Sequence, residues 1–139
     1  FDCEGFVVKG RYAYLFTKNR TEPFDGISKV YRIDLDAGKT TIQSWGEIQL
    51  CKNGWYPCSV TSASYNHETN ELLLLTYAKI LRFPKFNFDR NASNTFTYYS
   101  IGRLEQFEGI SHFGKHFFLS SEKQKIIGGN KLHKVRFKN

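Results

Sequence analysis

The sequence predicts an all-β fold. Short runs rich in Tyr, Phe, Val, Ile, Leu and Thr alternate with turn residues, and no segment keeps the periodicity of a helix. Of the 139 residues, 40% are hydrophobic and 24% are charged, which is enough apolar material to fill a packed interior. We therefore expect residues 1–139 to form a single β domain or part of one.

Eight runs are predicted as strands because Gly, Asn, Asp or Pro bounds each of them. In chain order they are Tyr12–Phe16, Lys29–Leu35, Thr40–Trp45, Glu71–Tyr77, Lys79–Phe83, Thr95–Ile101, Lys115–Ser120 and Leu132–Phe137. Hairpin turns are predicted at Lys9-Gly10, at 67–70 and at Phe113-Gly114, where Gly or Asn supplies the positive φ of a tight connection.

Internal repetition refines the fold class. Glu4 to Leu15 aligns without gaps on Glu108 to Leu119, and the strand Lys29 to Ile33 aligns on Lys131 to Val135. A degenerate third copy begins at Thr61. Copies about 50 residues apart predict about three four-stranded blades of a β-propeller, at about 1–50, 51–103 and 104–139.

Three blades leave a ring open, because propellers have ~4–8 blades. We expect half of a six-bladed ring, completed by a missing N-terminal half, by a second chain or by self-association. The chain contains no Met, even at position 1, so we also expect that an N-terminal segment was removed or left out. The alternative fold is a β-trefoil, which has three four-stranded copies and needs no partner.

The chain is basic, with 20 Lys and Arg against 13 Asp and Glu and a net charge of +7. The basic residues are spread along it, and the densest group, at 131–138, alternates as on the solvated face of an edge strand. Nucleic acid is therefore not the expected partner. The longest apolar run, Leu72 to Leu75, is too short for a transmembrane segment.

The three cysteines favour an oxidising compartment. Cys51 and Cys58 flank a turn-rich hexapeptide that lets their sulfurs meet, so we expect a disulfide rather than a metal site. Cys3 is then a buried thiol or the partner of a cysteine outside this chain. We expect a secreted, periplasmic or cell-surface protein. Asn19 and Asn91 begin glycosylation sequons.

Five segments carry a family resemblance. They are Glu4-Gly5, Tyr14 to Arg20, Ser62 to Asn70, Gln106 to Ile110 and Leu119 to Glu122. In this order they resemble a family of secreted, mostly uncharacterised β-propeller proteins common in the Bacteroidetes, which is loosely similar to phytase-like and gluconolactonase-like six-bladed propellers. Members are longer than this chain, which implies that it corresponds to their C-terminal half.

The repeat places Glu4 and Glu108 at equivalent positions near the expected channel. The resemblance implies a metal site, because in calcium-dependent six-bladed propellers a glutamate before glycine at this place is often a ligand, and Ca²⁺ prefers oxygen donors. The middle copy departs from this pattern with Thr61-Ser62. The competing interpretation is structural, with each carboxylate held by backbone donors or by a neighbouring Lys or Arg.

Four polar residues follow the next strand of their copies and are candidate ligand-binding residues at the channel mouth. They are Lys18, Asn19, Arg20 and Glu122. An opposite-charge pair at these positions would be structural, whereas Lys18 with Arg20 could hold a phosphate or carboxylate. Of the four histidines, His67, His112, His116 and His133, only His112 and His116 have metal-site spacing, on opposite sides of a turn. We expect no cysteine pair and no acidic partner beside them, and therefore surface or strand positions.

No catalytic motif is present in the sequence. The favoured function is an exported β-propeller module that binds a small ligand, a glycan or a protein. The alternative is a calcium-dependent hydrolase of esters, lactones or phosphoesters, and a third hypothesis is a purely structural interaction module. The first two differ on whether Glu4 and Glu108 share a cation or pair with basic side chains.

Overall fold

The computed structural model describes residues 2–39, 41–51, 53–102, 105–123 and 130–137, and in these ranges it confirms the all-β prediction. The strands are β1 (Cys3–Lys9), β2 (Tyr12–Thr17), β3 (Ile27–Asp34), β4 (Ile42–Gln49), β5 (Val60–Asn66), β6 (Glu71–Thr76), β7 (Lys79–Phe83), β8 (Thr97–Ser100), β9 (Gln106–Phe113), β10 (His116–Glu122) and β11 (Leu132–Val135). One short helix, α1 (Trp55–Cys58), was not expected from the sequence.

The strands form three antiparallel sheets in which neighbours in sequence are neighbours in space. The first sheet has the order β1-β2-β3-β4, the second β5-β6-β7-β8, and the third β11-β10-β9. The hairpins that open them turn at Gly10, Asn70 and Gly114, with φ of 59°, 57° and 56°. These values confirm the predicted turns, since glycine and asparagine tolerate this left-handed region.

The same irregularity recurs in the first strand of every sheet. The register shifts between Cys3 and Gly5, between Val60 and Ser62, and between Ser120 and Ser121 opposite β9. The bulged residues are thus Glu4, Thr61 and Glu108, the positions aligned by the sequence repeat. A bulge re-aims the strand and its side chains, so its recurrence gives the repeat a structural basis.

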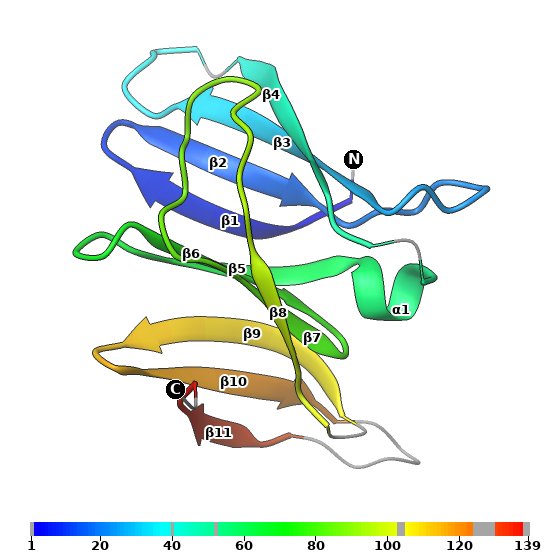
Figure 1. Cartoon of the computed structure of the whole chain (residues 1–139). Coiled ribbons are helices and arrows are strands. Elements are labelled where there is room, and N and C mark those ends of the chain that lie inside the picture. Colours follow the sequence, from blue (N-terminus) through cyan, green and yellow to red (C-terminus); the bar gives the residue numbers. More distant parts are fainter. Residues whose placement is uncertain (1, 40, 52, 103–104, 124–129, 138–139) are drawn as a thin grey trace.

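The sheets are stacked with their first strands adjacent. Strand β5 lies beside β1 and beside β9, as Figure 1 shows. Hydroxyl groups of β5 join the second and third sheets, since Ser62 Oγ accepts from Ile110 N at 3.2 Å and Ser64 Oγ from His112 N at 3.0 Å. Three separate sheets differ from a β-trefoil, in which strands of all three copies close one barrel.

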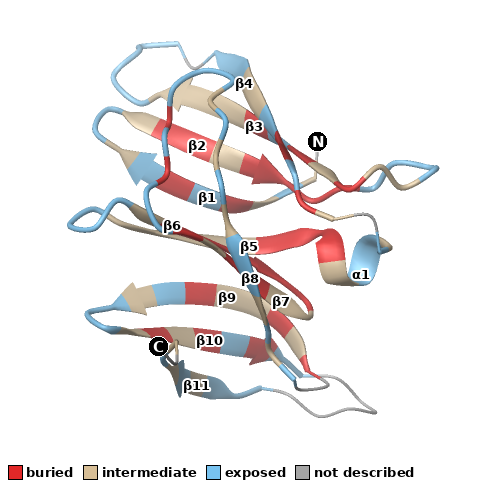
Figure 2. Cartoon of the chain, in the orientation of Figure 1, coloured by how far each residue is buried: buried red, intermediate tan, exposed pale blue. Residues whose placement is uncertain are grey.

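Two apolar clusters fill the spaces between the sheets, and the buried residues concentrate in the middle of the molecule (Figure 2). Between the first and second sheets lie, among others, Phe16, Leu74 and Phe83. Between the second and third lie Leu75 and Phe107. Each fully buried side chain of this size contributes ~1.5–3 kcal/mol to folding.

The segment 84–96 extends the first cluster. It leaves β7, passes over the first sheet and returns to β8 (Figure 1). Phe86 and Phe88 are buried there, and Trp45 Nε1 donates to Phe88 O at 2.7 Å. This covering segment was not expected from the sequence.

The third sheet departs from the expected four strands, because three are described in it. The predicted strand over Leu132–Phe137 ends at Val135. Phe137 turns inward instead, and its ring packs 4.7 Å from that of Phe117 and 4.4 Å from that of Tyr99. Burying this ring between the sheets takes the chain out of the ladder.

No helix in the described residues has the length and apolar character needed to cross a membrane.

Candidate functional site

A buried ion pair lies beside the first bulge. Lys18 Nζ lies 2.8 Å and 2.9 Å from the two carboxylate oxygens of Glu4 and donates to Tyr77 Oη at 2.6 Å. Lys18 is 7% exposed. Burial lowers the pKa of Lys18, but the hydrogen bonds to Glu4 and Tyr77 outweigh this and raise it above its ordinary value. The lysine is therefore held in its charged form.

A disulfide-tied loop places aromatic rings next to this ion pair. Cys51 and Cys58 form the predicted disulfide, with Cα atoms 5.5 Å apart. Between them, the Tyr56 ring stacks on Tyr77 at 5.2 Å, and Trp55 meets Tyr77 edge-on at 5.9 Å. Trp55 is 57% exposed and Tyr56 38%. We call Trp55, Tyr56 and Tyr77 the aromatic platform.

Asn19 and Arg20 are used within their own loop. The Asn19 amide donates to Ile27 O at 2.8 Å and to Asp25, and its Oδ1 accepts from Thr21 N at 2.8 Å. Ile27 N also donates to Asp25 Oδ1 at 2.9 Å, and this bond, followed by the one from Asn19, lowers the pKa of Asp25. Arg20 pairs with Asp2. With Asn19 5% exposed, the sequon there is inaccessible, whereas Asn91 is exposed.

Glu108 and Glu122 lie together in the third sheet. Gln106 Nε2 donates to Glu108 at 2.7 Å and to Glu122 at 3.2 Å. The repeat places Lys18 and Glu122 at equivalent positions, where an opposite-charge pair was considered. In the structure Lys18 pairs with Glu4, and Glu122 accepts from Gln106.

The two predicted metal ligands occupy equivalent bulges but have different partners, Lys18 for Glu4 and Gln106 for Glu108. Within the described ranges, no group of three or more His, Cys, Asp or Glu side chains is placed to hold a metal ion. The calcium site stays a prediction. The basic partner of Glu4 matches the structural interpretation of that residue.

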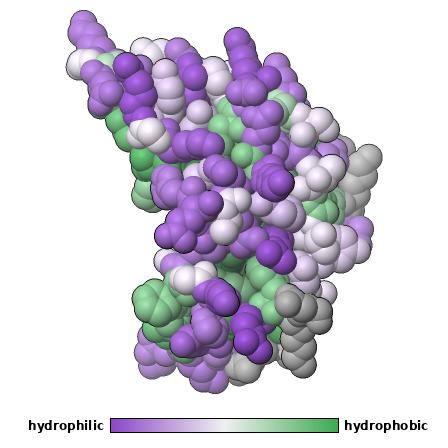
Figure 3. All heavy atoms as spheres, turned by 60° about the vertical axis from the view of Figure 1, so that its left-hand side comes forward, coloured by the Kyte–Doolittle hydropathy of each residue, from purple (hydrophilic) through white to green (hydrophobic). Residues whose placement is uncertain are grey.

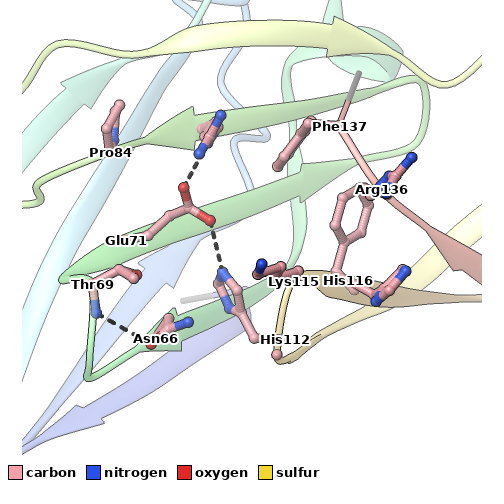
Figure 4. Close-up of a pocket in the computed structure, with 12 residues that line it drawn as sticks. Asn66, Thr69, Glu71, Pro84, His112, Lys115, His116, Arg136 and Phe137 are labelled. Carbon is pink, nitrogen blue, oxygen red and sulfur yellow. Dashed lines mark hydrogen bonds and ion pairs between the residues drawn. The ribbon is translucent and has the colours of Figure 1, made fainter. Parts of the chain in front are cut away.

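A groove close to 910 Å³ in volume opens between the second and third sheets, and no sequence pattern predicted it. Its walls come from the β5–β6 turn, β6, β7, the β9–β10 turn and the segment after β11 (Figure 4). The lining residues are Asn66, Thr69, Glu71, Arg82, Pro84, His112, Gly114, Lys115, His116, Phe117, Arg136 and Phe137. We call it the lateral groove.

A chain of polar contacts crosses the inner wall of the lateral groove. Arg82 Nε lies 2.5 Å from Glu71 Oε2, His112 Nε2 lies 3.1 Å from Glu71 Oε1, and His112 Nδ1 lies 2.8 Å from Ser64 Oγ. Burial raises the pKa of Glu71, but the hydrogen bonds from His112 and Arg82 outweigh it and leave the pKa below its ordinary value. Glu71 is thus held as a carboxylate.

Ser64 contacts His112, and His112 contacts Glu71. This serine–histidine–carboxylate order of contacts is also found in acyl-transfer triads. Ser64 does not line the groove, and its Oγ already accepts from the backbone N–H of His112. The hydroxyl therefore faces the neighbouring sheet, where it fixes the imidazole and joins β5 to β9. These contacts orient Glu71 and Arg82 at the wall of the groove.

The expectation that the histidines lack acidic neighbours is wrong for two of them. His112 contacts Glu71, and His133 Nε2 lies 2.9 Å from Glu105 Oε2. Both carboxylates belong to other strands or loops, 41 and 28 residues away in sequence, so no local motif could reveal them. One alternative for Cys3, a buried thiol, is wrong as well, because the thiol is free and exposed.

Comparison with known proteins supports the fold. No family model matches the chain, and no curated protein matches it. Among solved structures it is similar to a chain in the crystal structure of a nidogen/laminin complex, a β-propeller-containing structure, with a TM-score of 0.50 and 10% sequence identity over 86% of this chain. The match covers 39% of that longer chain.

Proposed function

We propose that this chain is part of an exported β-propeller that binds a protein partner through the aromatic platform. The observation that carries the proposal is an exposed Trp55 and Tyr56 on a loop closed by a disulfide. Trp and Tyr are enriched among the residues that dominate binding energy at protein interfaces. Two large aromatic side chains that are exposed and adjacent form an apolar patch, and such patches indicate an interaction site.

The platform is held in place before any partner arrives. The disulfide restricts the loop, and the Tyr56 ring stacks on Tyr77, whose hydroxyl accepts from the buried Lys18. Rigid aromatic groups lose little conformational entropy on binding, so more of the contact energy appears as affinity. The Glu4–Lys18 pair thus helps to position the platform, because Lys18 contacts the hydroxyl of Tyr77, on which Tyr56 stacks.

The propeller assignment rests on the way the sheets stack. Ala63 and Tyr65 of the second sheet pack against the first sheet, and Ile110, in the equivalent register, packs against the second. The corresponding residues of the first sheet are Phe6 and Val8, which are 63% and 38% exposed. We propose that a further blade covers them, supplied by the rest of the polypeptide or by another copy.

Export is proposed from the disulfide, because such bonds persist in secreted, periplasmic and cell-surface proteins. Proteins of oxidising compartments commonly act by binding, and the platform lies on the loop that this bond closes. Glycans and small molecules, the other ligand classes expected from the sequence, are separate outcomes of the test below.

The experiment is a binding screen with the native protein against arrays of extracellular proteins and of glycans. We expect protein ligands whose binding falls at least about tenfold in Trp55→Ala and in Tyr56→Ala. Tyr98→Ala is the matched control, because Tyr98 is 61% exposed on β8, away from the platform. Ligands that bind both platform variants as well as the native protein, or glycan ligands alone, would contradict the proposal.

A further inference from the structure

The lateral groove has the charge and size of a site for an organic anion. Three permanent cations line it, Arg82, Lys115 and Arg136, with a single carboxylate, Glu71, among its described residues. Both oxygens of that carboxylate are already engaged, by Arg82 and His112. The positive charge of Lys115 and Arg136 is therefore not neutralised within the groove.

Apolar surface accompanies this charge. Phe137 and Phe117 line the groove, with ring centroids 4.7 Å apart, and the Arg82 guanidinium lies 4.8 Å from the centre of the Phe137 ring. Figure 4 shows Lys115, His116 and Arg136 around the same end of the groove as Phe137. Figure 3, which brings this side forward, shows green apolar atoms in the narrowed part of the molecule, flanked by purple hydrophilic residues.

The cationic wall is positioned in advance. Glu71 holds Arg82 at 2.5 Å, His112 holds Glu71, and Ser64 holds His112. An arginine fixed by a carboxylate on one side and an aromatic ring on the other loses little entropy when an oxyanion binds to it. A volume near 910 Å³ falls within the range of small-molecule sites.

From these observations we propose that the lateral groove binds a small organic oxyanion, a carboxylate or phosphate ester with an apolar body. The anionic group meets Arg136, Lys115 and Arg82, and the apolar body packs against Phe137. This site is separate from the aromatic platform and does not depend on the function proposed for it.

The test uses four probes with the full chain at constant ionic strength and neutral pH: phenyl phosphate, benzoate, inorganic phosphate and benzyl alcohol. Binding is followed by NMR of the histidine ring protons. We expect the aromatic anions to move the signals of His112 and His116, which line the groove, more than that of His133, which contacts Glu105 and lines an adjoining pocket. Comparing phenyl phosphate with benzoate shows which anionic group is preferred.

Variants separate a built site from general attraction to a basic protein. Arg136→Ala and Lys115→Ala are each expected to weaken the aromatic anions about tenfold. Lys39→Ala removes the same charge from an exposed turn of the first sheet and should change binding less than twofold, roughly the effect of a distant screened charge. Phe137→Leu should reduce the preference for phenyl phosphate over inorganic phosphate.

Three results would overturn the proposal. They are equal affinity for phenyl phosphate and inorganic phosphate, equal loss in Lys39→Ala and Arg136→Ala, and shifts of all four histidines together. Absence of binding by every probe up to millimolar concentration would also reject it. Loss of the platform's protein ligand has no bearing here, so the two proposals fail independently.

Discussion

Lys18 connects the first bulge to the second sheet. It is buried, and its ammonium group joins β2 to Glu4 of β1 and to Tyr77 after β6. A buried cation is tolerable only while its partners remain, because desolvation of an unpaired charge is costly. The two members of the pair are not equivalent, since the side chain of Glu4 is 26% exposed and that of Lys18 only 6%.

This difference in exposure predicts which of two substitutions lowers the free energy of unfolding more. Glu4→Ala leaves the buried ammonium without its carboxylate and is expected to lower the free energy of unfolding by ~2–4 kcal/mol. Lys18→Met removes the buried charge itself, leaves a carboxylate that water can reach, and should cost less. Urea unfolding of both variants measures the difference. The reverse order would show that the pair is not the stabilising contact.

Glu105 predicts a response to acid. Hydrogen bonds from His133 and then Ser121 hold its pKa below the ordinary value of 4.5. A carboxylate with a lowered folded pKa stabilises the protein above its unfolded pKa, and this stability is lost as the pH falls through the folded value. Thermal unfolding from about pH 6 to about pH 3 should therefore show a falling Tm.

The control for acid sensitivity is Glu68→Gln, at an exposed position in the β5–β6 turn. Glu105→Gln should flatten the fall of Tm with pH, and Glu68→Gln should leave it unchanged. If both variants follow the wild-type curve, Glu105 is not the group that titrates.

At the scale of elements, the loop over 51–58 combines a covalent constraint with exposed rings. Six residues lie between the two cysteines. Closing so short a loop stabilises the fold by ~2–3 kcal/mol in the chain-entropy model. The same bond should fix the position of α1, which carries Trp55 and Tyr56.

Reduction of the disulfide, or Cys51→Ser with Cys58→Ser, is expected to lower stability by ~2–3 kcal/mol and to loosen the platform. Fluorescence of Trp55, measured in a Trp45→Phe background, reports the loosening as a shift and as faster quenching by iodide. Cys3→Ser provides the control, since that thiol is unpaired. Unchanged Trp55 fluorescence after reduction would mean that ring stacking alone holds the loop.

Sequence patterns predicted the turns of the three hairpins, but β1, β5 and β9, the first strand of each hairpin, are not among the eight predicted runs. Turns at Gly10 and Gly114 follow from a local demand for positive φ, and the run Leu72 to Leu75 marks a strand buried on both faces. The lateral groove and the Glu71–His112 contact could not be predicted, because they join residues far apart in sequence. The Gly-Trp-Tyr-Pro turn was the one local sign of the platform, as apolar aromatics in a turn are seldom there for packing.

At the scale of the molecule, the outer face of the first sheet is an exposed apolar surface of a strand ladder. Phe6, Val8 and Ile42 lie on it, 63%, 38% and 57% exposed. The equivalent faces of the second and third sheets are each covered by the preceding sheet. An uncovered apolar face of this kind favours association.

The isolated 139-residue chain is therefore expected to self-associate, with a mass about twice 16.2 kDa or more by light scattering. Phe6→Lys together with Ile42→Lys should return it to the monomer mass without unfolding it, as checked by circular dichroism. The double substitution Leu35→Lys with Tyr98→Lys, at residues 52% and 61% exposed, controls for added charge. A native monomer at high concentration would show that another copy of this chain does not supply the proposed cover.

The order of the sheets also gives the molecule a polarity. The first sheet ends in a surface that carries Phe6, Val8 and Ile42, and the third ends in one where Phe113, Phe118 and Leu132 lie beside Ser111, Ser120 and Lys134. Two copies that join by the same end form a contact of identical patches around a two-fold axis, whereas the end of one copy joined to the opposite end of the next is a head-to-tail contact. Head-to-tail joining either returns to its start or continues without limit, so the angle between successive sheets decides between a closed ring and a fibre.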